Sequence, residues 1–524
     1  MSALPSLIQD LLQPEAYPHR PKHIDLVQTH ISYVLLADDL VYKIKKPVNF
    51  GFLDFTTLEK RLFYCRRELE LNRRLAEEIY LDVVPIVKRQ DKYVLEAEGV
   101  PVEWAVKMKR LPEEGMMQRL IDQGLLQERH MELLVQKLVP FYQKAATGAE
   151  VNKYGSIETI SYNVEENFTQ TRDFVGLVLS PWRYKHIVTW TRKFLETQQA
   201  LFAQRVTEGF IRDGHGDLYS ANICFDEPHN KVYIFDCIEF NDRFRCGDVA
   251  QDLAFLAMDL DFHRLDHLAE FFIRRYTALA KDQGLYDLLD FYKCYRAYVR
   301  GKIGCFTWSA KEVAEEVRQK SLSQARRYFD LAYRYAQGLP VLLVFFGLSG
   351  SGKSTLARRI AQKLLATYYN SDVVRKEILG LDPKEHHYEP FGQGIYRPDI
   401  TQKTYQTLVE RALAHLAEGQ DVVLDATFLS KTLRSMVLEH VKSMPIKRLF
   451  VWCKAPEEVV KERLSKRKHL VHEPSDGRWE IYLAQKERFE PPEEIPPEEL
   501  FILDTNAPPE ELEAQILERL WGDM

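Results

Sequence analysis

The sequence lacks several features that would place the protein at a membrane or outside the cell. It has no apolar run of the roughly 18 residues that a spanning helix needs, and its first residues do not resemble a signal peptide. Its 7 cysteines form no Cys-x-x-Cys pair and are odd in number, which favours free thiols in a reducing compartment. A net charge of −6 gives no overall attraction to nucleic acid or to an anionic membrane. These absences predict a cytoplasmic protein and argue against nucleic acid or membrane partners.

The length of the chain predicts more than one domain. Its 524 residues, 45% of them hydrophobic and 28% charged, are too many for a single hydrophobic core. A glycine and a proline at positions 338 and 340 separate a helical region from an apolar strand, as expected of a linker. We therefore expect a first domain over residues 1–337 and a second over residues 338–524.

The clearest motif lies just after this linker. Residues 341–346 are a continuous apolar run, typical of a parallel strand that is buried on both faces. Residues 347–354 match the pattern G-x-x-x-x-G-K-[ST], in which backbone N–H groups surround phosphates, the lysine reaches the β/γ-phosphates and the hydroxyl binds Mg²⁺. A helical pattern follows, so the motif has the context that it requires. The residues predicted to bind the nucleotide, ATP, are Gly347, Ser349, Gly350, Ser351, Gly352, Lys353, Ser354 and Thr355.

Strands and helices alternate through the rest of the second domain. Asp372 and Arg375 follow the second strand, and Asp425 ends the third. This domain resembles P-loop kinases of the polynucleotide 5′-kinase, chloramphenicol phosphotransferase and gluconate kinase type. The resemblance implies a three-layer α/β domain with a parallel sheet, in which Asp372 is the catalytic base, Arg375 orients the acceptor or a phosphate, and Asp425 holds Mg²⁺ together with the P-loop serine.

Two arginines near the end of this domain have two interpretations. Arg463 and Arg467 lie where a lid helix of such kinases presents arginines to the transferring phosphoryl group, and the resemblance implies a catalytic role for them. They also belong to a basic run, residues 463–468, which would be equally typical of a solvated helix face.

A second set of polar residues lies in the first domain. The segment from His215 to Asn222 includes Asp217, and two strand-like runs joined by a turn then lead to Asp236. Kinase catalytic loops place a base Asp and a metal-binding Asn five residues apart, and a second metal-binding Asp follows a hairpin. The separations in this segment match that arrangement, so they predict phosphoryl transfer here as well.

At these residues the first domain resembles the aminoglycoside phosphotransferase-like, or choline-kinase-like, small-molecule kinases. The resemblance implies a two-lobed, protein-kinase-like fold, with a small lobe over about residues 1–111 and a large lobe over about residues 112–337. It also implies that Asp217 is the catalytic base, that Asn222 and Asp236 bind Mg²⁺, and that Asp252 fixes the loop. The family name does not fix the substrate.

The phosphate-binding lysine of the first domain is ambiguous. The residues from 31 to 45 predict a β-hairpin, in which Lys43 and Lys45 point to the same face. The resemblance implies Lys43, paired with Glu68 on a long charged helix over about residues 57–78, and Lys45 remains an alternative. No G-x-G-x-x-G pattern precedes them, so another loop would have to cover the phosphates.

Together these motifs predict a tandem ATP-dependent phosphotransferase that requires Mg²⁺ and acts on hydroxyl groups of small molecules. One alternative is a P-loop kinase regulated by a non-catalytic first domain, although a pure sensor need not keep both a base and metal ligands. Another is a nucleic-acid end kinase, which the acidic balance and the lack of an aromatic and basic binding stripe disfavour. The sequence indicates neither the acceptor of either domain nor the oligomeric state.

Overall fold

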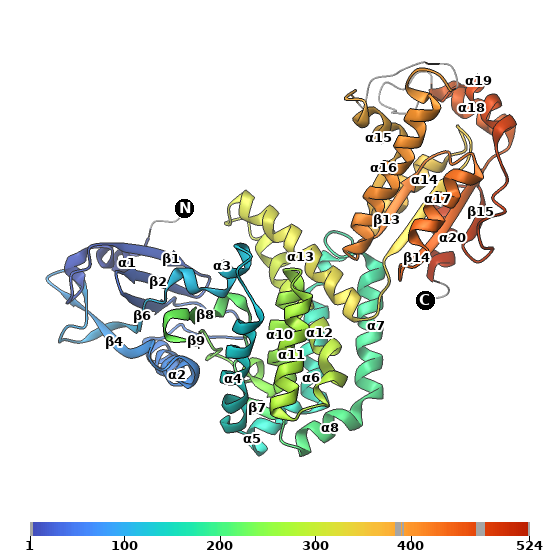
Figure 1. The fold of residues 1–524 in the computed structure, drawn as a ribbon. Helices are drawn as coiled ribbons and strands as arrows, with labels where there is room; N and C mark the ends of the chain where they lie inside the picture. Colours follow the sequence, from blue (N-terminus) through green and yellow to red (C-terminus); the bar gives the residue numbers. More distant parts are fainter. Residues whose placement is uncertain (1–3, 383–388, 390–391, 468–476, 522–524) are drawn as a thin grey trace. The chain divides into compact units, whose positions relative to one another are not determined.

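The computed structural model describes residues 4–382, 389, 392–467 and 477–521 (Figure 1). The chain forms two compact units: unit 1 comprises Met1–Gln170 and Trp190–Tyr328, and unit 2 comprises Thr171–Thr189 and Phe329–Met524. The boundary at residue 337 and the lobe limits within the first domain stay predictions.

Unit 1 begins with an antiparallel sheet of six strands, drawn in blue in Figure 1. The strands, in their order across the sheet, are β1 (Ile24–Gln28), β2 (Ser32–Ala37), β3 (Leu40–Lys45), β6 (Pro101–Lys109), β4 (Tyr80–Arg89) and β5 (Lys92–Leu95). Helix α1 (Ser6–Leu11) packs an apolar face on one side of the sheet. Helix α2 (Leu58–Ala76), whose N-terminus is capped by Thr57, packs against β4 and β6.

The predicted hairpin and the long charged helix are confirmed. Strand β1 was not predicted from the sequence. This strand lies at the edge of the sheet, and none of its residues is fully buried. It therefore lacks the apolar alternation that identifies a half-buried strand in a sequence.

The rest of unit 1 is mainly helical. Its helices are α3 (Met117–Asp122), α4 (Glu128–Lys144), α5 (Ala149–Asn152), α6 (Ile157–Gln170), α8 (Gln199–Thr207), α9 (Asp242–Arg245), α10 (Val249–Phe262), α11 (Asp266–Ala280) and α12 (Leu285–Ser309). Helices α7 (Pro181–Thr197) and α13 (Glu315–Tyr335) contribute residues to both units. Helix α10 is buried along most of its length and packs against α11 and α12. Two small sheets, β7 (Ile211–Asp213) with β10 (Cys246–Asp248) and β8 (Ile223–Asp226) with β9 (Lys231–Ile234), frame the segment that carries the kinase-like motif.

Unit 2 is built on a parallel sheet of five strands. Their order is β12 (Thr367–Asn370), β13 (Val422–Asp425), β11 (Val341–Phe346), β14 (Lys447–Lys454) and β15 (Leu500–Asp504). Every residue of β11 is buried, as expected for a strand covered on both faces. The predicted parallel α/β fold is therefore confirmed.

Helices cover both faces of this sheet. On one face, α15 (Ser371–Ile378), α16 (Pro398–Ala417) and α17 (Lys431–Val441) pack against Leu342, Val344 and Phe346. On the other, α14 (Lys353–Leu364) and α20 (Pro509–Trp521) pack against the alternate residues of β11. Helices α18 (Glu457–Arg467) and α19 (Trp479–Arg488) form a smaller cluster around Leu348.

Unit 2 also includes residues 171–189, which precede most of the unit in sequence. The guanidinium group of Arg183 is buried, with Nη2 2.8 Å from Asp421 Oδ1 and Nη1 in an ion pair with Asp330. Trp182 stacks on Trp521, with ring centroids 4.5 Å apart. These contacts explain why the segment groups with the C-terminal part of the chain.

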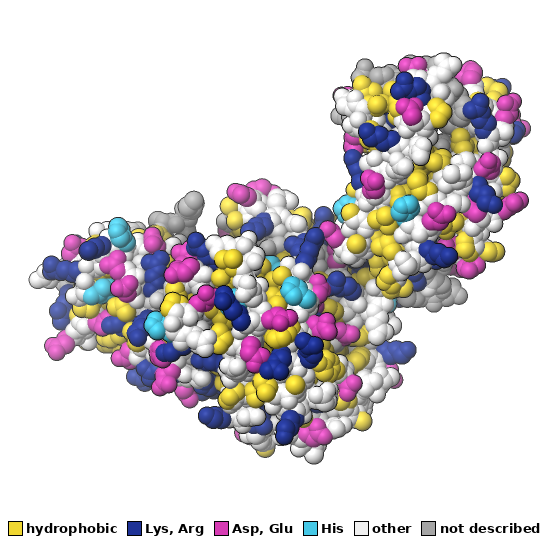
Figure 2. Space-filling view, in the orientation of Figure 1, with side chains coloured by type: hydrophobic (Ala, Val, Ile, Leu, Met, Phe, Trp, Pro, Cys, Tyr) yellow, Lys and Arg dark blue, Asp and Glu magenta, His cyan; other side chains and the backbone are white. Residues whose placement is uncertain are grey.

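Charged side chains of both signs are interspersed over the face of unit 1 that Figure 2 shows. Among the described residues on that face, Lys and Arg side chains form no continuous stripe. Throughout the described ranges, no helix is both long and apolar enough to cross a membrane.

Candidate active sites

The kinase-like motif of unit 1 forms a compact loop between β7 and β8. Asn222 Nδ2 donates hydrogen bonds of 2.9 Å to both Asp217 Oδ2 and the Asp217 carbonyl oxygen. The β8–β9 hairpin then leads to Asp236, whose backbone is left-handed with φ 60°. Two residues five positions apart are thus in direct contact, as the motif predicted.

Asp252, on α10, holds this loop in place. Its carboxylate accepts hydrogen bonds from the backbone N–H groups of His215 (2.7 Å) and Gly216 (2.9 Å). Gly216 has φ +83°, and a Cβ there would lie 2.8 Å from the carbonyl oxygen of Phe244, so only glycine fits. The expectation that Asp252 fixes the loop is confirmed.

His215 is buried beside the candidate base. Burial lowers its pKa to about 4, and Nε2 lies 3.0 Å from the carbonyl oxygen of Phe235. The imidazole is therefore neutral near pH 7 and supports the loop.

Both candidate lysines of β3 reach the same carboxylate. Lys43 Nζ lies 2.9 Å from Glu68 Oε1, and Lys45 Nζ lies 2.7 Å from Glu68 Oε2. Lys43 also pairs with Asp236, whereas Lys45 pairs with Glu239. Burial alone would raise the pKa of Glu68, but the two lysines lower it to about 2.

Lys43 is thus the lysine that contacts a predicted Mg²⁺ ligand. Lys45 is held in a buried cluster with two carboxylates, and its side chain is 1% exposed. The sequence analysis did not identify Glu239, because its contact with Lys45 joins residues that are almost 200 positions apart.

Asp217 has the properties of a general base that works near neutral pH. Burial raises its pKa to about 6, although the positive charge of Arg300 and the hydrogen bond from Asn222 oppose that rise. The carboxylate is therefore mostly ionised at pH 7 and yet basic enough to accept a proton from a hydroxyl group.

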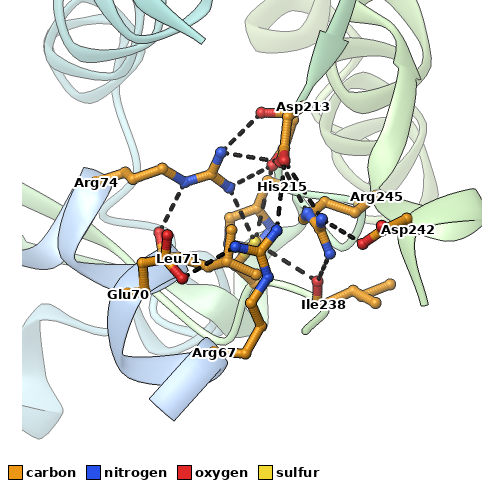
Figure 3. A network of polar contacts seen from close by, with 12 residues as sticks. Arg67, Glu70, Leu71, Arg74, Asp213, His215, Ile238, Asp242 and Arg245 are labelled. Carbon is orange, nitrogen blue, oxygen red and sulfur yellow. Dashed lines mark hydrogen bonds and ion pairs between the residues drawn. The ribbon is translucent and has the colours of Figure 1, made fainter. Parts of the chain in front are cut away.

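A polar network connects α2 to the catalytic loop (Figure 3). Arg74 Nη1 donates to the Asp213 carboxylate (3.0 Å) and carbonyl oxygen (2.8 Å), and Nη2 donates to the carbonyl oxygen of Gly214 (2.7 Å). Arg245 Nε donates to the same carboxylate oxygen, Asp213 Oδ1, at 2.8 Å, and its Nη2 donates to Oδ2 at 3.3 Å. Because α2 carries Glu68, the network fixes the Lys43–Glu68 pair relative to the loop. Sequence reasoning missed it.

In unit 2 the predicted P-loop joins β11 to α14. Gly347 has φ +138°, and a Cβ there would lie 2.4 Å from the carbonyl oxygen of Cys453, so the loop requires glycine at this position. The backbone N–H of Ser349 donates to Gln485 Oε1 at 2.8 Å. Lys353 and Ser354 begin α14, whose N-terminus adds partial positive charge to the loop.

Asp425 lies at the carboxyl end of β13, next to Phe345 of β11. Its Oδ2 accepts hydrogen bonds of 2.6 Å from Tyr368 Oη and from Asn370 Nδ2. Its Oδ1 is buried and has no hydrogen-bond partner among the residues that the structure describes. One oxygen is therefore fixed, and the other is left for a ligand near the P-loop.

The structure brings Asp372 and Arg375 together on α15. Arg375 Nη1 donates to Asp372 Oδ1 at 2.8 Å, and the guanidinium group lies 4.6 Å from the ring centroid of Tyr396. Asn370 caps this helix by accepting hydrogen bonds from the backbone N–H groups of Asp372 (2.9 Å) and Val373 (3.2 Å). Since Asn370 also donates to the carboxylate at the end of β13, it connects two predicted site residues, and the sequence analysis did not assign it a role.

Arg463 lies beside the P-loop. Its Nη1 donates to the side-chain oxygen of Thr505 at 3.0 Å, and its Nη2 donates to the Thr505 carbonyl oxygen at 2.6 Å. Thr505 Oγ1 in turn donates to the carbonyl oxygen of Ser351, in the P-loop, at 2.7 Å. The contact of Arg463 with a phosphoryl group stays a prediction. The side chain of Arg467 lies outside the described residues.

Each site includes oxygen ligands of the kind that Mg²⁺ prefers. In unit 1 these are the Asn222 amide oxygen and the carboxylate of Asp236, which is 47% exposed; in unit 2 they are the Ser354 hydroxyl and Asp425 Oδ1. Across the described ranges, no group of three or more His, Cys, Asp or Glu side chains could hold a metal ion. Mg²⁺ is usually bound through one or two protein ligands plus substrate phosphates, so these residues fit it.

Comparison with known proteins supports both halves of this description. A family model described as "Phosphotransferase enzyme family" matches residues 162–291, and one described as "AAA domain" matches residues 342–492. An uncharacterized protein of Mycobacterium tuberculosis is 30% identical over 442 residues, which cover 84% of this chain and 86% of that protein. The chain belongs to the family of that protein. In this family member, an aminoglycoside phosphotransferase-like region is followed by a P-loop kinase region.

Two further similarities are more local. A cytidylate kinase of Methanopyrus kandleri is 32% identical over 135 residues, which cover 25% of this chain and 65% of that protein. A solved structure of an ethanolamine kinase of Plasmodium vivax is 11% identical, with a TM-score of 0.36, and the match covers 58% of this chain and 81% of that chain. The family models support ATP-dependent phosphoryl transfer as the general activity of this family member.

Proposed function

We propose that this family member is a tandem, Mg²⁺-dependent phosphotransferase whose two units each transfer the γ-phosphoryl group of ATP to a hydroxyl group of a small molecule. The observation that carries the proposal is the contact between Asp217 and Asn222. This contact brings a candidate base and a candidate metal ligand together in unit 1, and unit 2 has its own P-loop.

In unit 1 the acceptor hydroxyl would bind at Asp217. The oxygen attacks the γ-phosphorus, the bond to the leaving ADP oxygen breaks, and Asp217 takes the hydroxyl proton. Lys43 holds the α/β-phosphates, and its contact with Glu68 orients it. Mg²⁺, held by Asn222 and Asp236, would neutralise the phosphate charge.

In unit 2 the P-loop amides and Lys353 hold the phosphates of ATP, and Asp372 takes the proton of the acceptor hydroxyl. Arg375, fixed by its ion pair with Asp372, positions the acceptor or a phosphate oxygen. Ser354 and Asp425 would hold Mg²⁺. Arg463 connects α18 to the P-loop through Thr505, a position that supports its proposed role at the transferring phosphoryl group.

That unit 2 phosphorylates an alcohol is our proposal, because the similar proteins do not agree on the type of acceptor. The similar proteins include a cytidylate kinase, a shikimate kinase and a probable gluconokinase, whose names point to different acceptors. A carboxylate placed to accept a proton favours a hydroxyl acceptor, because a phosphate acceptor is already ionised at neutral pH.

The test is to incubate the full chain with γ-labelled ATP, Mg²⁺ and a cell metabolite extract. Wild type should form at least two labelled products, of which Asp217→Asn loses one and Lys353→Ala the other. If Lys353→Ala abolishes all labelling and Asp217→Asn none, unit 1 is not an enzyme and the tandem proposal is wrong. Labelling of oligonucleotide ends in preference to metabolites would instead support a nucleic-acid end kinase.

A further inference from the structure

Two arginines of α12 lie beside the loop that carries Asp217. Arg296 and Arg300 are one helical turn apart and therefore lie on the same face of the helix. The guanidinium carbon of Arg296 is 4.7 Å from the ring centroid of Phe255. The guanidinium carbon of Arg300 is 4.8 Å from the ring centroid of Tyr219. The two rings stack with centroids 5.4 Å apart. Since Tyr219 is two residues from Asp217, the stack holds both positive charges near the candidate base.

The electrostatic environment of Asp217 includes these two arginines as well as a residue of the proposed nucleotide site. Burial raises the pKa of Asp217, Arg300 and Arg296 lower it, and Asp236 raises it. Asp236 in turn pairs with Lys43, the proposed phosphate ligand. Asp217 is thus influenced both by a proposed metal ligand that pairs with Lys43 and by two arginines that have no role in the proposed nucleotide site.

The carboxylates near this arginine pair are already engaged. Arg296 Nη2 lies 3.6 Å from Asp252 Oδ1, but Asp252 accepts hydrogen bonds from two backbone N–H groups of the loop. Asp259 Oδ2 accepts a hydrogen bond of 3.0 Å from the backbone N–H of Ser220. These carboxylates therefore neutralise the positive charges of the two arginines only in part.

Arg300 shares a hydrogen bond with the Tyr328 side chain, and Arg296 is ion-paired with Asp252, but each arginine also has a donor atom that makes no hydrogen bond to any described residue. Arg296 Nη2 and Arg300 Nε are buried and make no hydrogen bond within the described part of the chain. Leaving a buried donor unsatisfied costs about 1–3 kcal/mol, so such atoms call for an acceptor group. A carboxylate or phosphate supplies several acceptor oxygens in the geometry that a guanidinium group favours.

We propose that the acceptor of unit 1 is an anionic alcohol: a small molecule with a carboxylate or phosphate group in addition to the hydroxyl that receives the phosphoryl group. Arg300 binds the anionic group, and Arg296 supports it. The proposal rests on the proposed function of unit 1. The anionic group is unchanged by the reaction, because only the hydroxyl loses its proton and gains the phosphoryl group. Two guanidinium groups at this position disfavour a cationic acceptor.

The charge of the acceptor can be tested before its identity is known. The full chain is incubated with γ-labelled ATP, Mg²⁺ and a metabolite extract that has first passed over a strong anion exchanger or a strong cation exchanger. We expect the Asp217-dependent product to disappear after anion exchange and to persist after cation exchange. An Asp217-dependent product that survives anion exchange overturns the proposal. Treating the extract with a phosphatase, which is then removed, distinguishes a phosphate-bearing acceptor from a carboxylate.

Variants test whether Arg300 binds the acceptor or only packs. Arg300→Ala should raise the KM for the acceptor at least tenfold, and Arg300→Lys should retain part of the affinity. Arg327→Ala is the matched control, because Arg327 also stacks on an aromatic ring, Phe262, at 4.1 Å, and donates to its carbonyl oxygen at 2.7 Å. Equal losses in Arg300→Ala and Arg327→Ala would show that the aromatic stack is structural and would overturn the proposal.

A binding measurement keeps this proposal separate from the activity. Calorimetric titration of the full chain, saturated with ADP and Mg²⁺, uses glycerol 3-phosphate and D-glycerate as anionic probes and glycerol as the neutral control. We expect at least one anion to bind and to lose at least tenfold in affinity in Arg300→Ala. Absence of binding by both anions, or binding that does not depend on Arg300, overturns the proposal. If no Asp217-dependent product forms but Arg300-dependent binding remains, the proposed activity fails and the anion site stands.

Discussion

The two candidate sites are built in different ways. In unit 2 the proposed phosphate-binding groups lie in one continuous stretch, residues 347–354, and most of them would be backbone N–H groups. In unit 1 the corresponding groups are side chains from β3, α2, the catalytic loop and the end of the β8–β9 hairpin. The unit 2 site depends on local backbone conformation, whereas the unit 1 site depends on how several separate segments are held together.

The largest expected effect separates the two chemistries directly. Asp217→Asn keeps the size of the side chain and the hydrogen bond from Asn222 but removes the base, so the rate of the unit 1 product should fall by about 10³-fold. The rate of the unit 2 product should not change. Single-turnover labelling of each product measures both rates. A matching loss in unit 2 would mean that the two reactions are not independent.

A somewhat smaller loss is expected for the base of unit 2. Asp372→Ala should lower kcat by about 10²-fold or more, while the affinity for ATP stays near that of wild type. Equilibrium titration with a fluorescent ATP analogue provides the affinity. A large loss of nucleotide binding would instead assign Asp372 to the nucleotide site.

The pH dependence of the unit 1 product should follow the ionisation of Asp217. Burial raises the pKa of Asp217 to about 6, and only its ionised form accepts a proton. The rate of the unit 1 product should therefore be nearly constant above pH 7 and fall about tenfold between pH 7 and pH 5. The pH profile of initial rates at saturating substrates tests this expectation. A unit 1 rate that stays constant down to pH 5 would contradict the assignment of Asp217 as base.

The smallest expected effect tests how far the unit 1 site depends on distant contacts. Arg74→Ala removes the hydrogen bonds between α2 and the loop at Asp213 and Gly214, so kcat for the unit 1 product should fall about fivefold through misplacement of the Lys43–Glu68 pair. Arg129→Ala is the control, because Arg129 is 63% exposed and pairs with Glu227 at the surface. Equal rates in both variants would show that the network has no influence on catalysis.

The same contrast explains what could be predicted from the sequence. The P-loop and the Asp217–Asn222 pair are encoded in short segments, so spacing alone was enough to predict them. The parallel sheet followed from the apolar strands that alternate with helices. The hairpin pattern placed Lys43 and Lys45 on one face, and the structure shows both of them at Glu68.

Residues that act through long-range contacts could not be predicted in this way. Glu239, Arg74 and Arg300 have no distinctive local pattern, and their partners lie far away in sequence. Asn370 has the local signature of a helix cap, but its second contact, with Asp425, depends on the order of strands in the sheet. Such contacts become visible only when the topology is known.

Because residues 171–189 belong to unit 2, the chain cannot be divided into its two units by a single cut. Arg183 is the buried counter-ion of Asp421, and Trp182 stacks on Trp521. A C-terminal fragment that began at the glycine-proline linker would keep the complete P-loop but lose both the ion pair of Asp421 with Arg183 and the stacking of Trp521 on Trp182. The P-loop kinase region therefore depends for part of its stability on residues 171–189, a segment that lies within the preceding phosphotransferase-like region of the sequence.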